Sequence, residues 1–527
     1  MRLLVTAALL ALPTLLHAQG ACGPGPVALV LSGGGAKGLA HAGAIAALEA
    51  RGIRPDLVVG TSMGAVVGAL YAGGRDPRAL DSLARALPLA EAFRGYQPEP
   101  PAVFAPRPPL LVWAEEKGRL ELQASAVQVP LVNRMLTTEL LAANLAAAGD
   151  FDRLPIPFRA VAADLLADTA VVFRGGDLAA AVRASASIPV VFPPIEIGGR
   201  PLVDGGIVAN IPVAVARAEG AVRVIVVDVS DPLDDSLDTG SPIAVTARMM
   251  DLLSRQPLPP LGPGDLYIRP RIDAFDALDF RPARVDSLLA LGRRAADSAL
   301  DANGCPFPDA PTGRRADAAT LVRLATVRVE GLPAEEGARL ARGLLLEPGT
   351  TLALDTLRSR IGTVMQREAL RAIWITPAGS DPARLTVRAD PPPRRRAVLG
   401  AAFDADLGGR AWVGVMDRAL VSPAWEGALA LAFGAGRTSL DAGVRRRFPV
   451  SRLVPTLALG LASERVEFFD GDAAATDAEG RQATAFLGLE AILGGGWTAA
   501  LGGEAIAWDD SGEPGRGAGG ATLRLLR

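Results

Sequence analysis

The first half of the chain alternates short, continuous apolar runs with segments in which apolar residues recur at helical spacing. The runs predict buried strands at 26–32, 56–60, 158–165 and 222–229. The segments between them predict helices, beginning with 39–51 and a second helix from Met63 onward. Strands separated by helices indicate a parallel sheet with helices on both faces, which is an α/β domain. Helices and loops over 240–300 are expected to close this domain.

A stretch rich in proline and glycine, 305–316, is followed by a different pattern. Residues 322–331 predict a strand, 335–370 predict two helices, and 371–376 and 384–389 predict two more strands. This β-α-α-β-β order is typical of a small α+β domain, and the run PPPRRR at 391–396 marks its end.

After this break the apolar residues recur with a period of two. In GALALAF, 427–433, the leucines and the phenylalanine share one face, and in TLALGL, 456–461, the leucines again share a face. Four of the six tryptophans fall in this region: Trp412, Trp425, Trp497 and Trp508. Alternating strands with interfacial aromatic residues predict a transmembrane β-barrel, although a soluble β-sandwich shows the same alternation.

The N-terminus has the pattern of a secretory signal peptide, with Arg2, an apolar run from Leu3 to Leu16 and a small residue at Ala18. The run is shorter than the roughly 20 residues of a membrane-spanning helix. We therefore expect export, with cleavage after Ala18. In an exported protein the two cysteines, Cys22 and Cys305, are expected to pair, the alternative being two unpaired thiols.

Length and charge narrow the classes of function. The chain has 527 residues, more than one ordinary domain holds, and a net charge of -3. There is no basic stripe, so nucleic acid is not expected as a partner. No cluster of histidine and cysteine suggests a metal site, and the chain has only two histidines.

Ser62 is the first candidate for chemistry. It stands in VVGTSMGAVVG, 58–68, where a strand pattern turns sharply into a helix pattern and presents a serine between glycines. A serine needs a positioned base to act as a nucleophile. His17 lies in the predicted leader, which leaves His41, and a helix histidine bonded to a neighbouring loop is the simpler interpretation of that residue. A carboxylate is therefore considered as the base.

The second candidate is the glycine loop in LVLSGGGAKGLAHAG, 29–43. The amides of Gly33, Gly34 and Gly35 can converge on an anion at a helix N-terminus, which in acyl transfer would be an oxyanion hole. The same glycines match a dinucleotide-binding pattern, but the second strand ends in GTSMG rather than in the required acidic residue. A phosphate-binding loop is excluded because Gly38 follows Lys37 where serine or threonine is required.

Three aspartates end apolar strands and could act as a base. Asp204 precedes two glycines in GGRPLVDGGIVANIP, 198–212, while Asp164 and Asp228 end two further strands. The sequence pattern alone does not rank the three.

The motifs SGGGAKG, GTSMG and DGG, in this order, resemble the patatin-like phospholipase family. The resemblance covers about 28–230 and includes the segments between the motifs. It implies a parallel-sheet hydrolase domain with a Ser-Asp dyad, in which Ser62 is the nucleophile and Asp204 the base, while the glycine loop forms the oxyanion hole. It also implies that no metal or other cofactor is needed, that Asp164 is structural and that Pro189 shapes a loop near the site.

The whole chain resembles the outer-membrane members of that family, which add a POTRA-like domain and a β-barrel. The expected organisation is a signal peptide at 1–18, a patatin-like domain at 24–305, a linker at 306–320, a POTRA-like domain at 321–390 and a barrel region at 396–527. The last region has room for roughly eight strands, and it ends in LRLLR without the usual terminal aromatic residue. We therefore expect a truncated sequence or a partial barrel that is completed by a partner chain, such as a second copy in a homodimer.

The expected function is an exported lipid acyl hydrolase that acts on phospholipid or lysophospholipid at a membrane. Its barrel would anchor it in the outer membrane, with the hydrolase domain periplasmic or extracellular. The alternative is an outer-membrane assembly or translocation protein whose patatin-like domain is not catalytic. Nucleotide binding through the glycine loop is a third and weaker hypothesis.

Overall fold

The protein was analysed as a computed structural model, which describes residues 25–92, 111–116, 118–122, 129–189, 191–230, 252–253, 257–258, 260–307, 322–368, 370–379, 381–404, 408–422, 425–434, 436–446, 453–470, 473–494, 497–510 and 516–526. These residues fall into two compact units. Unit 1 takes in those up to 95, from 125 to 362 and from 372 to 389, and unit 2 takes in the others. The predicted leader, Cys22 and most of the predicted linker lie outside the described residues.

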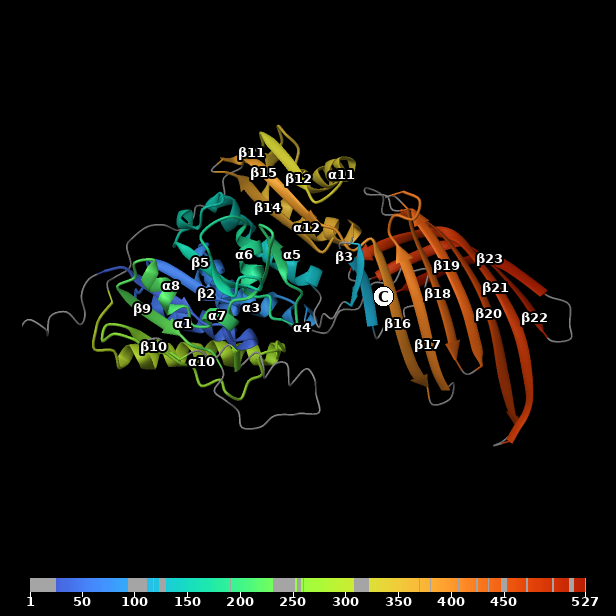
Figure 1. The fold of residues 1–527 in the computed structure, drawn as a ribbon, viewed down its shortest axis with the longest axis horizontal. Coiled ribbons are helices and arrows are strands. Elements are labelled where there is room, and N and C mark those ends of the chain that lie inside the picture. The colour runs from blue at the N-terminus through green and yellow to red at the C-terminus, as the bar shows by residue number, and fades with distance from the viewer. Residues whose placement is uncertain are drawn as a thin grey trace, which may run out of the picture. The chain divides into compact units, whose positions relative to one another are not determined.

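Unit 1 is built on an eight-stranded sheet, which includes the four strands that the sequence predicts in the first half (Figure 1). Its order is β10 (Leu266–Ile268), β9 (Arg223–Val227), β1 (Val27–Leu31), β2 (Leu57–Thr61), β5 (Phe158–Asp164), β8 (Arg200–Asp204) and β7 (Ile195–Ile197), and β6 (Thr169–Phe173) also pairs with β5. The strands from β10 to β5 run parallel, whereas β6, β7 and β8 pair antiparallel. The antiparallel part was not expected from the sequence.

Helices cover both faces of this sheet because its central strands are apolar on both sides. Leu29 and Leu31 face a core that includes residues of α1, α2, α5, α6 and α10, whereas Val30 and Val59 face α8 on the other side. The helical elements of this part are η1 (Gly35–Leu39), α1 (Ala40–Ala50), α2 (Met63–Ala72), α3 (Pro77–Ala86), α4 (Leu89–Ala92), α5 (Val129–Ala147), η2 (Phe151–Arg153), α6 (Leu178–Ser185), α7 (Gly206–Ala209), α8 (Val213–Ala218) and α10 (Pro282–Asp301). Among the described helices, none is long and apolar enough to cross a membrane.

A small α+β part follows. It has the two helices and the two later strands that the sequence predicts, but the expected strand 322–331 is divided in two and a short strand, Thr351–Leu352, lies between the helices. It contains β11 (Val322–Arg323), β12 (Thr326–Glu330), α11 (Ala334–Leu344), β13 (Thr351–Leu352), α12 (Leu354–Glu368), β14 (Ala372–Ala378) and β15 (Asp381–Asp390). Its three-stranded sheet has the order β12-β15-β14. Within unit 1, β14 contacts α5: the Thr137 hydroxyl donates to the Ile373 carbonyl at 2.9 Å, and Trp374 is buried. The POTRA-like assignment of this part stays a prediction.

Unit 2 is a ten-stranded antiparallel sheet (Figure 1). Eight strands come from the region with period two: β16 (Arg395–Asp404), β17 (Gly408–Asp417), β18 (Trp425–Gly434), β19 (Arg437–Arg446), β20 (Leu453–Asp470), β21 (Ala473–Gly494), β22 (Trp497–Asp510) and β23 (Arg516–Leu526). The other two, β3 (Leu111–Glu116) and β4 (Arg119–Leu122), lie inside the range expected for the hydrolase domain, and β3 pairs with β16.

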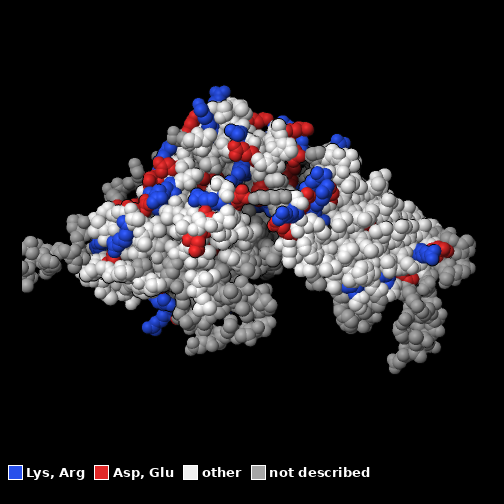
Figure 2. Space-filling model, viewed as in Figure 1, with Lys and Arg blue, Asp and Glu red and all other residues white. Residues whose placement is uncertain are grey.

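The two faces of the sheet in unit 2 differ in polarity. Leu429 and Leu459 are about half exposed, at 46% and 51%, and they belong to a larger set of exposed apolar side chains on these strands. The opposite face buries Glu426 and Glu490, and Arg445 forms ion pairs with both. Figure 2 shows few charged residues over these strands, whereas charges gather over the small α+β part. The large antiparallel sheet is compatible with a barrel, and the barrel itself stays a prediction.

Candidate active site

Ser62 lies at the turn between β2 and α2 on a backbone that residues other than glycine rarely adopt. Its φ is 55° and its ψ is -125°, which corresponds to strain of about 1–3 kcal/mol. A Cβ atom on Gly60 would lie 2.5 Å from the Gly64 carbonyl oxygen, and one on Gly64 would lie 2.4 Å from the Leu31 carbonyl oxygen. The two glycines of the motif are therefore required for the close approach of strand and helix that forms the turn.

Asp204 lies within hydrogen-bonding distance of Ser62. The Ser62 hydroxyl donates to Asp204 Oδ2 at 2.5 Å, and the Gly206 amide donates to Asp204 Oδ1 at 2.8 Å. Both side chains are almost completely buried. Two residues that are 142 positions apart in the chain thus form one hydroxyl–carboxylate pair.

The pairing of β5 explains why the two residues meet. Strand β2 pairs with β5 in parallel and ends at Thr61, opposite Val161. Strand β8 pairs with β5 antiparallel and ends at Asp204, opposite the next residue of β5, Ala162. Because β6 occupies the opposite edge of β5 at these positions, β2 and β8 share one edge and approach each other end to end. Ser62 follows Thr61, so the nucleophile candidate and the carboxylate lie at the junction of the two strand ends.

Burial raises the pKa of Asp204 to about 6. The hydrogen bonds from Ser62 and Gly206 and the positive charge of Arg183 oppose this increase. A carboxylate with a pKa near 6 is ionised at neutral pH and can still accept a proton during a reaction, as a general base must.

Asp164 has a structural role in the turn after β5. Its Oδ1 accepts hydrogen bonds from the amides of Leu166 and Ala167 at 2.9 and 3.2 Å. This agrees with the structural role that the family resemblance implies for Asp164.

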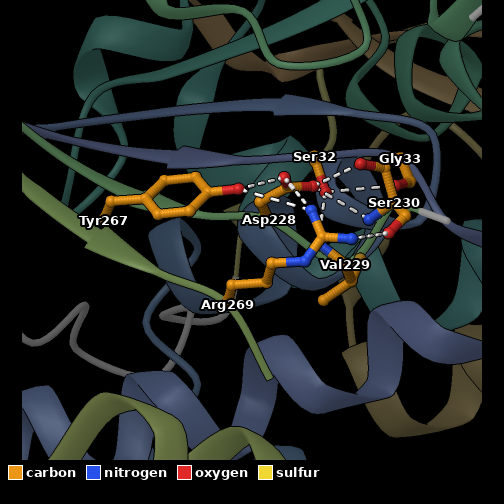
Figure 3. A network of polar contacts seen from close by, with 7 residues as sticks. All are labelled: Ser32, Gly33, Asp228, Val229, Ser230, Tyr267 and Arg269. Atoms are coloured by element: carbon orange, nitrogen blue, oxygen red, sulfur yellow. Dashed lines mark hydrogen bonds and ion pairs between the residues drawn. The ribbon is translucent and has the colours of Figure 1, made fainter. Parts of the chain in front are cut away.

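Asp228 at the end of β9 is engaged in a separate polar network (Figure 3). Its carboxylate accepts hydrogen bonds from the Tyr267 hydroxyl at 2.6 Å, from Arg269 at 3.2 Å and from the Ser230 hydroxyl at 2.5 Å. Among the described residues, Asp204 is the only one of the three aspartates bonded to Ser62.

His41 is fully buried and is bonded to the backbone rather than to Ser62. Its Nε2 lies 2.9 Å from the Ser32 carbonyl oxygen, and because a carbonyl only accepts, Nε2 donates. Burial lowers the pKa of His41 to about 4, and this bond and the charge of Asp228 oppose the decrease. The imidazole is therefore neutral at physiological pH, and the simpler interpretation of His41 agrees with the structure.

The glycine loop lies beside Ser62, but its three amides are not equivalent. A Cβ atom on Gly33 would lie 3.2 Å from Ser62 Cβ, so the loop contacts the candidate nucleophile. The Gly33 amide already donates to the Asn210 carbonyl at 3.2 Å. Within the described residues, the amides of Gly34 and Gly35 have no acceptor. The oxyanion-hole hypothesis therefore depends on Gly34 and Gly35 more than on Gly33.

Residues 29–217 match the family model described as patatin-like phospholipase. The chain contains a patatin-like phospholipase domain. The matched range includes Ser62, Asp204 and the glycine loop.

Relatives of the patatin-like domain occur in bacteria and in yeast. An uncharacterized NTE family protein of Mycobacterium bovis is 37% identical over 205 residues, which are 38% of this chain and 48% of that protein. The lysophospholipase NTE1 of Debaryomyces hansenii is 28% identical over 301 residues, which are 52% of this chain and 18% of that protein. The match thus spans less than half the length of these relatives. VipD from Legionella pneumophila has a TM-score of 0.36 at 15% identity, covering 54% of this chain and 68% of that one.

Three buried polar residues around the patatin-like dyad were not identified from the sequence. The Ser185 hydroxyl accepts a hydrogen bond from the Ser62 amide, Arg183 acts on Asp204 through its charge, and the Asn210 carbonyl binds the glycine loop. Each contact depends on tertiary structure, so no local signal could have found it. The predicted loop residue, Pro189, follows Ser187, whose carbonyl accepts a hydrogen bond from the Asp204 amide.

Within the part of the chain that the structure describes, no group of three histidine, cysteine, aspartate or glutamate residues is placed to hold a metal ion. Cys305 is disulfide-bonded, which agrees with the predicted pairing, but Cys22 lies outside the described residues.

Proposed function

We propose that this protein is an exported lipid acyl hydrolase of the phospholipase A or lysophospholipase type. The observation that carries the proposal is the 2.5 Å hydrogen bond from the Ser62 hydroxyl to Asp204, formed on a strained turn within a patatin-like domain. Ser62 is the nucleophile and Asp204 is the general base. The substrate is a fatty acyl ester of a phospholipid or lysophospholipid.

Acylation begins when Ser62 Oγ attacks the acyl carbonyl carbon and its proton passes to Asp204. The carbonyl oxygen becomes an oxyanion, which the amides of Gly34 and Gly35 can bind, each donor lowering the barrier by roughly 3–4 kcal/mol. When the intermediate collapses, the alcohol portion of the lipid leaves with the proton that Asp204 holds. The fatty acyl group then remains on Ser62 as an ester.

Deacylation repeats the sequence with water as the nucleophile. Asp204 takes a proton from the water as it attacks the acyl ester, and the oxyanion again forms at the glycine loop. Collapse of this intermediate returns the proton to Ser62 Oγ and releases the fatty acid. No step requires a histidine, a metal ion or an organic cofactor.

The test is lipid-product profiling with the purified full chain in detergent. Mixed micelles of phosphatidylglycerol, phosphatidylethanolamine and their lysophospholipids are incubated with the protein, and released fatty acids are quantified by mass spectrometry. Wild type should release fatty acid, whereas Ser62→Ala and Asp204→Asn should each lose at least 10³-fold in rate. Activity that survives in Asp204→Asn would contradict the dyad. Absence of hydrolysis by folded wild type would instead favour the alternative of a non-catalytic patatin-like domain.

We further propose that unit 2 anchors the protein in the outer membrane as a barrel or part of one. Its support is the exposed apolar face of β16–β23 together with the buried, ion-paired charges on the opposite face. Fractionation of producing cells tests this proposal. The chain should appear in the outer-membrane fraction and resist extraction with alkaline carbonate, and a chain found in the soluble fraction would contradict it.

A further inference from the structure

The last residue of α6, Ser185, and the turn that follows it lie where the two strand ends of the dyad meet. The Ser187 carbonyl accepts a hydrogen bond from the Asp204 amide at 3.0 Å, and the Ser185 carbonyl accepts one from the Gly205 amide at 3.3 Å. Main-chain groups of this turn therefore hold the end of β8. The Ser185 side chain also bonds to Ser62, the residue that follows β2.

The hydroxyl of Ser185 joins Ser62 to β5. It accepts a hydrogen bond from the Ser62 amide at 2.9 Å and donates one to the Val161 carbonyl at 2.5 Å. Ser185 is fully buried. The chain leaves the sheet at Ser62, so the Ser62 amide and the Val161 carbonyl need another partner there. The Ser185 hydroxyl satisfies both, because it can accept one hydrogen bond and donate another.

The element that carries Ser185 is rigidly held. All residues of α6 from Leu178 to Ser185 are buried. At its N-terminus Asp177 accepts a hydrogen bond from the Ala180 amide at 2.8 Å, and the same carboxylate accepts from Asn144 at 3.0 Å and from Thr376 at 2.6 Å. Helices α5 and α6 and strand β14 are thus connected at this end, which fixes the position of the hydroxyl at the other end.

We propose that Ser185 is a positioning residue for the dyad, an inference that rests on the proposed hydrolase function. Its hydroxyl holds the amide of Ser62 in the strained turn and so keeps Ser62 Oγ directed at Asp204. Loss of the hydroxyl would leave two buried backbone groups unpaired and would let the turn relax away from φ 55°. A small displacement of a nucleophile is sufficient to reduce turnover strongly without changing how the lipid binds.

The test compares Ser185→Ala with Thr137→Val in the full chain. Thr137 is the control because its hydroxyl is also buried and donates to a backbone carbonyl, that of Ile373 at 2.9 Å, and does not bond to the dyad. We expect kcat on a micellar lysophospholipid to fall about 10²-fold in Ser185→Ala with KM within about twofold. In Thr137→Val, kcat should stay within about threefold.

Amide hydrogen exchange of peptides covering 57–68 provides a readout that does not depend on activity. Exchange at Ser62 should be at least tenfold faster in Ser185→Ala than in Thr137→Val. Ser185→Cys, which keeps a weak donor and acceptor of similar shape, should recover part of both effects and replaces the alanine variant if that fails to fold. Unchanged exchange at Ser62 in Ser185→Ala, or equal losses of kcat in Ser185→Ala and Thr137→Val, would overturn the proposal. Absence of hydrolysis by wild type together with the expected exchange pattern would reject the proposed function but support the positioning role.

Discussion

The pKa of Asp204 sets the pH range in which the proposed hydrolase works. Burial raises this pKa from the usual 3.8 to about 6, even though hydrogen bonds from Ser62 and Gly206 and the charge of Arg183 act in the opposite direction. The difference corresponds to about 3 kcal/mol in favour of the neutral carboxyl. Because the base must be ionised to accept the proton of Ser62, activity should be lost as the pH falls through 6.

The assay is the pH dependence of kcat/KM for a soluble p-nitrophenyl ester between pH 4.5 and 9. A single base with a pKa near 6 gives half of the plateau value at pH 6, about a tenth at pH 5 and a tenfold loss per pH unit below that. His41, with a pKa of about 4, is neutral throughout the upper part of this range. His41→Gln should therefore leave the acid limb where it is.

Two results would refute this reasoning. An inflection near pH 4 would mean that Asp204 is solvated in the working enzyme and that burial does not set its pKa. An inflection near pH 7 that His41→Gln shifts or removes would identify the imidazole as the base.

Two further outcomes follow from the same pKa values. Because the pKa of Asp204 is raised in the folded state, its contribution to stability is fully present below pH 3.8 and is lost as the pH rises through 6. Asp204→Asn should therefore raise the free energy of unfolding by up to about 3 kcal/mol at pH 8 and by almost nothing at pH 3.5. Pulse proteolysis in urea measures both values. His41→Gln should keep at least a third of wild-type kcat, since a glutamine amide can replace the donor to the Ser32 carbonyl; a loss of 10²-fold or more in initial-rate assays would show that His41 takes part in the reaction.

The turn that carries Ser62 could be predicted from a local motif, because its geometry depends on residues that are close together in the sequence. The glycines at 60 and 64 are needed because strand and helix backbones approach so closely there, and this requirement appears directly as Gly-Thr-Ser-Met-Gly. The central parallel strands were predictable for a similar reason, because burial on both faces produces continuous apolar runs.

The choice among the three aspartates could not be made from the pattern. Asp164, Asp204 and Asp228 all end apolar strands, and what distinguishes Asp204 is that β8 shares an edge of β5 with β2. Strand order is a tertiary property, and the resemblance to a family supplied this information where the pattern lacked it. The same limit applies to the hairpin of β3 and β4, whose pairing with β16 joins segments that are about 280 residues apart.

The polarity of unit 2 leads to a prediction about what its leucines face. A period of two occurs in soluble sandwiches and in membrane barrels alike, but a sandwich buries its apolar face, whereas Leu459 is 51% exposed here. If this face contacts lipid, Leu459→Arg should destabilise the folded membrane form by about 2–4 kcal/mol, and Leu459→Ala should cost much less because it remains apolar. If the face contacts water, both variants should behave like wild type, since surface substitutions usually change stability by less than about 0.5 kcal/mol. Urea titration of the chain folded into lipid vesicles distinguishes the two cases, and equal midpoints for the arginine and alanine variants would refute membrane insertion of β20.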